Sequence, residues 1–79
     1  MSSDRARIVA LLREAVMVTQ SASIVIGLSR VADDIERREL DLTVAYRRLD
    51  YALARTRSPA VLAAATAALE FIGAQRGKS

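Results

Sequence analysis

Apolar side chains recur every three or four residues along almost the whole chain, a spacing that places them on one side of an α-helix. The composition agrees, because alanine and leucine are abundant while the chain has three glycines and one proline. The sequence therefore predicts an all-α fold, a small antiparallel bundle of four helices, with a bundle of three longer helices as the alternative. We expect one helical domain over residues 1–79, with helices at about 4–18, 23–39, 42–56 and 59–75.

The uncharged stretch 16–29, VMVTQSASIVIGLS, contains the clearest break in this pattern. The apolar residues of 8–16 share one helical side, but those of 24–35 would lie nearly opposite if the helix continued. Either the helix breaks near the serines, or one long helix is buried first on one side and then on the other. We favour a break, because Ser21 and Ser23 are suitable N-caps. The stretch is then a helix–helix corner packed in the core, except for Ile26, which points away from the stripe of its own helix and is either a second contact surface or a packed corner residue.

The third and fourth predicted helices have clear start signals. Asp41 can cap the third helix, and Ser58 followed by Pro59 is typical of a helix start. Gly77 is expected to lie beyond the end of the fourth helix. The predicted buried stripes are Leu42, Ala45, Tyr46, Leu49, Ala52 and Leu53 in the third helix, and Val61, Leu62, Ala65, Ala68, Leu69 and Ile72 in the fourth.

Several function classes lack the residues that they need. The chain has no cysteine and no histidine, so a thiolate nucleophile and the commonest general base are both absent. No glycine-rich phosphate loop or metal-ligand spacing occurs, and we expect no enzyme activity, no metal and no cofactor. The stretch 16–29 is too short to cross a bilayer, which requires about 20 apolar residues. We therefore expect a cytoplasmic protein.

The acidic residues between 33 and 41 are the one cluster of carboxylates that could hold a hard cation. Their spacing instead suggests salt bridges along an exposed helix face. Asp33 with Arg37, and Asp34 with Arg38, are separated by four residues, the spacing at which helical side chains meet. We expect these two pairs on a solvated face.

One face of the third helix has the composition of a binding surface. Opposite its apolar stripe lie Val44, Arg47, Arg48, Tyr51 and Arg55, which we call the Arg–Tyr face. Tyrosine and arginine are enriched among the residues that dominate binding energy at protein interfaces. A tyrosine among arginines could also stack a nucleic-acid base while the arginines contact phosphates. A third interpretation is plain exposed surface, with the tyrosine packed under arginine side chains and no partner.

Size and charge favour association as the function. With 52% hydrophobic residues in 79, the chain has more apolar material than so small a monomer easily buries. Residues 30–41 are net acidic and 47–57 net basic, so two copies could pair these regions, although adjacent helices of one chain could do the same. We predict a homodimer acting by protein–protein interaction, as an adaptor or regulatory protein.

The alternative is a non-specific nucleic-acid-binding module on the Arg–Tyr face. The formal charge of +3 permits such a partner. Sequence-specific reading is not expected, because the exposed side of the fourth predicted helix presents mainly Ala63, Thr66, Ala67 and Glu70. Contact would be to phosphates and would weaken with salt.

Overall fold

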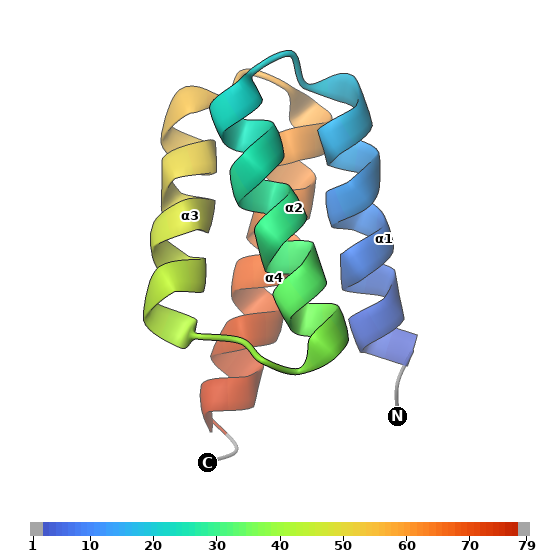
Figure 1. Ribbon diagram of the computed structural model, residues 1–79, viewed down its shortest axis with the longest axis vertical. Coiled ribbons are helices and arrows are strands. Elements are labelled where there is room, and N and C mark those ends of the chain that lie inside the picture. The colour runs from blue at the N-terminus through green and yellow to red at the C-terminus, as the bar shows by residue number, and fades with distance from the viewer. Residues whose placement is uncertain (1–2, 78–79) are drawn as a thin grey trace.

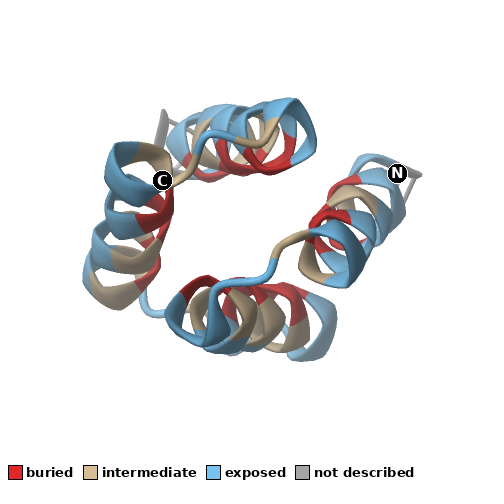
Figure 2. Ribbon diagram, turned by 90° about the horizontal axis from the view of Figure 1, so that it is seen from above, coloured by how far each residue is buried: buried red, intermediate tan, exposed pale blue. Residues whose placement is uncertain are grey.

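The computed structural model describes residues 3–77, with side chains from 4 to 75, and these residues form four α-helices. The helices are α1 (Ser3–Val18), α2 (Ala22–Arg37), α3 (Leu42–Arg55) and α4 (Pro59–Gly77). Each packs antiparallel against its neighbours in the chain, and α4 closes the bundle by packing against α1 (Figures 1 and 2). The predicted all-α antiparallel bundle is confirmed, in its version with the shorter helices.

The two ends of the bundle are built from different connections. The α1–α2 and α3–α4 connections lie at one end, at the top of Figure 1, whereas the α2–α3 connection lies at the other. The first end therefore combines the last turns of α1 and α3 with the first turns of α2 and α4. Residues far apart in the sequence meet there.

The predicted break lies at 19–21, and a side-chain cap explains where α2 begins. The Ser21 hydroxyl accepts a hydrogen bond from the Ile24 amide at 3.4 Å, which satisfies one of the free amides of the first turn. Asp41 caps α3 in the same way, since its carboxylate accepts from the Val44 amide at 3.2 Å. In α4, Pro59 is the first helical residue, directly after Ser58.

Two helix ends differ from the prediction. Helix α2 stops at Arg37, because Arg38 adopts a left-handed conformation with φ of 61°. The amides of Arg38 and Glu39 then donate to Asp34 and Ile35 carbonyls, which closes the helix end. Helix α4 includes Gly77 rather than ending before it, and no glycine in the described residues takes a positive φ that would stop a helix.

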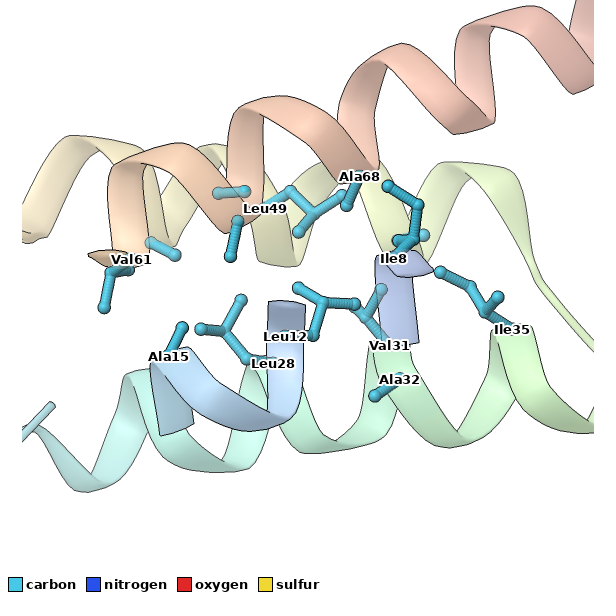
Figure 3. Close-up of a cluster of buried hydrophobic side chains, with 14 of the residues drawn as sticks. Ile8, Leu12, Ala15, Leu28, Val31, Ala32, Ile35, Leu49, Val61 and Ala68 are labelled. Atoms are coloured by element: carbon cyan, nitrogen blue, oxygen red, sulfur yellow. The ribbon is translucent and has the colours of Figure 1, made fainter. Parts of the chain in front are cut away.

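The core is aliphatic and contains many alanines. Ile8, Leu12, Leu28, Leu49 and Ile72 are at most 1% exposed and meet along the bundle axis, as Figure 3 shows for the first four. Between them lie small side chains that allow the helix backbones to approach closely. These buried alanines are Ala15, Ala32, Ala45, Ala52, Ala64, Ala65 and Ala68. No polar side chain is buried within the part of the chain that the structure describes.

The predicted stripes match this core except at their edges. Leu62 was assigned to the buried stripe of the fourth helix but is 38% exposed, and Ala64 is buried in its place. Leu62 lies about 100° around the helix from Val61, in the first turn of α4, where the bundle ends. Among the described helices, none combines the length and the apolar character needed to cross a bilayer.

Replacing Leu28 tests the core. Leu28 is fully buried, so Leu28→Ala removes its contacts and leaves a cavity, and should lower the free energy of unfolding by about 2–5 kcal/mol. Leu62→Ala, the same change at a partly exposed position, should cost clearly less. Urea unfolding followed by circular dichroism measures both. Equal losses for the two variants would contradict the described packing.

Replacing Arg38 tests the α2 end. A left-handed conformation strains any residue with a Cβ, so Arg38→Gly should raise the free energy of unfolding by up to about 1 kcal/mol. Arg37→Gly, one residue earlier and still helical, should lower it. The same urea titration compares them, and destabilisation by Arg38→Gly would show that its conformation is wrong.

Candidate interaction surface

The Arg–Tyr face divides into a row and one outer residue. Val44, Arg48, Tyr51 and Arg55 are spaced by four, three and four residues, which places them in one row along α3. That row lies on the side of α3 next to α2, because Arg48 contacts residues of α2. Arg47 is exposed and lies further outward.

Tyr51 is exposed, as predicted, and interacts with one arginine of the face. Its side chain is 41% exposed, and the Arg55 guanidinium carbon lies over the ring at 5.0 Å from its centroid. This distance is that of a cation–π contact, which contributes about 0.5–1 kcal/mol at an exposed site. One side of the ring is therefore already covered by Arg55.

Arg48 is partly committed to the fold rather than free for a partner. Its guanidinium lies 3.6 Å from an Asp34 carboxylate oxygen of α2, and both side chains are about one-third exposed, 29% and 32%. The basic segment of α3 thus meets the acidic segment of α2 within one chain. This pair shows the intrachain version of the charge pairing predicted from the sequence.

The predicted pairs of Asp33 with Arg37 and of Asp34 with Arg38 are wrong. Arg13 of α1 instead binds Asp33 at 3.0 Å and Glu36 at 3.1 Å. The hydrogen bond that Arg13 donates to Asp33 and the negative charge of Glu36 raise the pKa of Arg13, and together they outweigh the opposing effect of burial. Arg38 cannot pair at the predicted spacing, because its left-handed conformation lies beyond the end of the helix.

Exposed large apolar side chains gather at one end of the bundle. Met17 is 85% exposed, Val18 58%, Ile26 56%, Tyr51 41% and Leu62 38%. All five lie within about five residues of the end that contains the α1–α2 and α3–α4 connections, and we call this surface the apolar end. The expectation that the stretch 16–29 is a corner packed in the core is therefore wrong at Met17 and Val18, whereas Ile26 points outward as one of its two alternatives required.

Charge is sparse near the apolar end, where Glu14 and Asp50 are the acids that flank it in the sequence. Residues 15–29 carry no charge, and residues 51–69 carry two arginines, Arg55 and Arg57, and no acid. The opposite end mixes both signs, with the run Glu36 to Asp41 in and after the last turn of α2. The absence of charge in 16–29 was visible in the sequence. The sequence also indicates that Met17 and Val18 point outward, because helical spacing places both away from the buried side formed by residues 8–16.

Three hollows on the surface are lined by residues other than those of the apolar end. A hollow of about 410 Å³ lies along α1 and α2 and is lined by Arg5, Ala6, Val9, Ala10, Arg13 and Glu36. Its charged groups include the ion pair of Arg13 with Glu36, and its floor is alanine and valine. These lining residues include no nucleophile and base that could act together.

Neither a metal site nor a matching protein indicates a function for this surface. Within residues 3–77, no group of three or more acidic side chains is close enough to hold a metal ion. Comparison with protein-family models, curated proteins and solved structures finds no match. A function must therefore be inferred from the chain's own exposed residues.

A double-mutant cycle measures how strongly Arg48 is held. Arg48→Gln, Asp34→Asn and the double variant should show a coupling of at most about 1 kcal/mol in unfolding free energy, because the pair is long and partly solvated. The coupling should fall at high salt. A coupling of several kcal/mol would mean that Arg48 is a structural residue and not part of an interaction surface.

Proposed function

We propose that this protein is a small, non-enzymatic, cytoplasmic helical bundle that acts by self-association and protein–protein interaction, as an adaptor or regulatory protein. The apolar end supports the proposal most directly. Met17, Val18, Ile26, Tyr51 and Leu62 are each exposed, and all lie near the same end of the bundle. Contiguous exposed apolar surface commonly marks a site of protein–protein contact.

Burial on association would stabilise a complex. Each Å² of apolar surface removed from water contributes about 25 cal/mol, before the cost of association is subtracted. The absence of carboxylates from residues 51–69 and of any charge from residues 15–29 lowers the cost of drying this surface. Tyr51, with Arg55 stacked on it, adds the residue types that dominate interface energies.

A second copy of the chain is the simplest occupant of the apolar end. A two-fold contact brings the same surface from both copies together, so one exposed patch is sufficient. We therefore propose a homodimer that buries Met17, Val18 and Leu62. Arg55 and Arg57 would lie at its rim, where like charges stay solvated.

Non-specific nucleic-acid binding on the Arg–Tyr face is the less favoured alternative. The partial commitment of Arg48 to Asp34 and the stacking of Arg55 on Tyr51 reduce the groups available to phosphates and bases. Titration with an oligonucleotide at two salt concentrations tests it, because phosphate contacts weaken steeply with salt. Loss of affinity with salt and with Arg47→Ala would favour it.

Charged substitutions at the apolar end test self-association. Met17→Glu combined with Leu62→Glu would place carboxylates in the contact. We expect the dissociation constant of the dimer to rise at least about tenfold. Ala6→Glu, at an exposed position of the opposite end, is the control and should leave the mass unchanged.

Light scattering after gel filtration, over a range of protein concentrations, gives the mass in solution. A dimer that resists salt and is lost only in the double variant would support the proposal. A wild-type monomer at every concentration would contradict self-association.

A further inference from the structure

The exposed face between α2 and α3 combines residues from both helices. The two helices are in contact here, because a Cβ added at Gly27 would lie 3.8 Å from the Arg48 Cβ, an ordinary van der Waals distance. Ile26, beside Gly27, is 56% exposed, and Arg30 lies one helical turn further along α2 and is exposed. We call the α2–α3 seam the surface formed by these two residues and the Arg–Tyr face.

The seam is basic with an apolar centre. Arg30, Arg47 and Arg55 have no carboxylate partner among residues 4–75, whose side chains are described. Of the acids beside the seam, Asp34 is already paired with Arg48, while Asp50 is exposed next to Tyr51. Ile26, Val44 and Tyr51 lie between these arginines and are partly or largely exposed.

We propose that the α2–α3 seam binds an acidic amphipathic helix of a partner protein. The proposal rests on the proposed function, since it names the partner of an interaction surface. A row with spacings of four, three and four along α3, beside a parallel row on α2, matches the apolar stripe of a helix laid along the seam. Glutamates flanking that stripe would meet the unpartnered arginines.

A second copy of this chain fits the seam less well than an outside partner. All three acids of α2 are already paired within the chain, since Asp33 and Glu36 bind Arg13 while Asp34 binds Arg48. Breaking those pairs to reach another copy would exchange ion pairs without a gain. The residues proposed for the dimer contact, Met17, Val18 and Leu62, offer no carboxylate either, so we assign the carboxylates that meet the seam to a different protein.

A nucleic acid also fits less well. Phosphates gain nothing from the exposed aliphatic side chains of Ile26 and Val44, and Asp34 would repel them. Arg55 covers one side of the Tyr51 ring, where a base would otherwise stack. A helix with an apolar stripe flanked by carboxylates is complementary both to the apolar centre of the seam and to its positive charge.

The probe is a synthetic helical peptide of about 18 residues, with leucine at every third or fourth position and glutamate on both flanks. Two matched peptides serve as controls: one with lysine replacing glutamate, and one of the same composition with its apolar periodicity scrambled. Fluorescence anisotropy of each labelled peptide with the full chain gives its affinity. We expect the acidic amphipathic peptide to bind at least about tenfold more tightly than either control.

Matched variants locate the binding. Arg47→Glu should weaken the acidic peptide at least about tenfold, whereas Arg7→Glu, an equal charge change at an exposed position of α1, should have little effect. Ile26→Ala should weaken it several-fold, and Met17→Ala should not. Circular dichroism checks that each variant remains folded.

Three results would overturn the inference. They are equal binding of the scrambled peptide, equal weakening by Arg7→Glu and Arg47→Glu, and tighter binding of a single-stranded oligonucleotide that competes with the peptide at the seam. If the peptide does not bind but the protein still forms a dimer that depends on Met17 and Leu62, only the seam proposal is contradicted. If the peptide does not bind and the protein is strictly monomeric, the self-association proposal is contradicted as well.

Discussion

The reversal of the apolar stripe at residues 19–21 is the constraint on which the rest of the bundle depends. Because the apolar residues of α1 and α2 would point in opposite directions on one continuous helix, the chain must turn back before both sets can enter one core. The Ser21 cap makes that turn short. The resulting helix pair supplies Leu12 and Leu28 to the core, against which α3 and α4 close.

The same turn produces the candidate surface. A short, uncharged connection brings the last residues of α1 and the first turns of α2 to the end of the bundle, where no further helix covers them within the described chain. Met17 and Ile26 consequently point into solvent. The α3–α4 connection ends at the same place and adds Tyr51 and Leu62. The apolar end is thus a by-product of how the core is completed.

The helices could be predicted from the sequence because helical periodicity is local. Capping residues such as Ser21 and Asp41 act on amides three residues away, so their effect can also be read directly. The ion pairs could not be predicted in this way. Arg13 meets Asp33 and Glu36 only because α1 and α2 pack side by side. These partners are at least 20 positions apart in the sequence.

The candidate site was partly visible for the same reason. The row containing Arg48, Tyr51 and Arg55 belongs to one helix, and its exposed tyrosine followed from periodicity. The contribution of Ile26 and Arg30 to the neighbouring surface depends on the close approach of α2 and α3 at Gly27, which is a tertiary property. Leu62 was misassigned because a helical stripe does not show where a bundle ends.

Charged and apolar residues contribute to different parts of this structure. Carboxylates of α2 are matched by Arg13 and Arg48, which leaves a basic exposed face on an apolar-centred surface. The core of the described chain contains no buried polar side chain, and its alanines allow the helices to pack closely. Exposed apolar and basic residues remain, and the proposed contacts with other proteins would cover both.

The most direct test of association through the apolar end is the backbone amide spectrum of the protein, recorded by NMR over a dilution series. If the account is right, the amide shifts that change with concentration belong to residues 15–29 and 51–62, while those of the α2–α3 connection stay constant. Shifts that do not depend on concentration, or that change mainly at the opposite end, would contradict it.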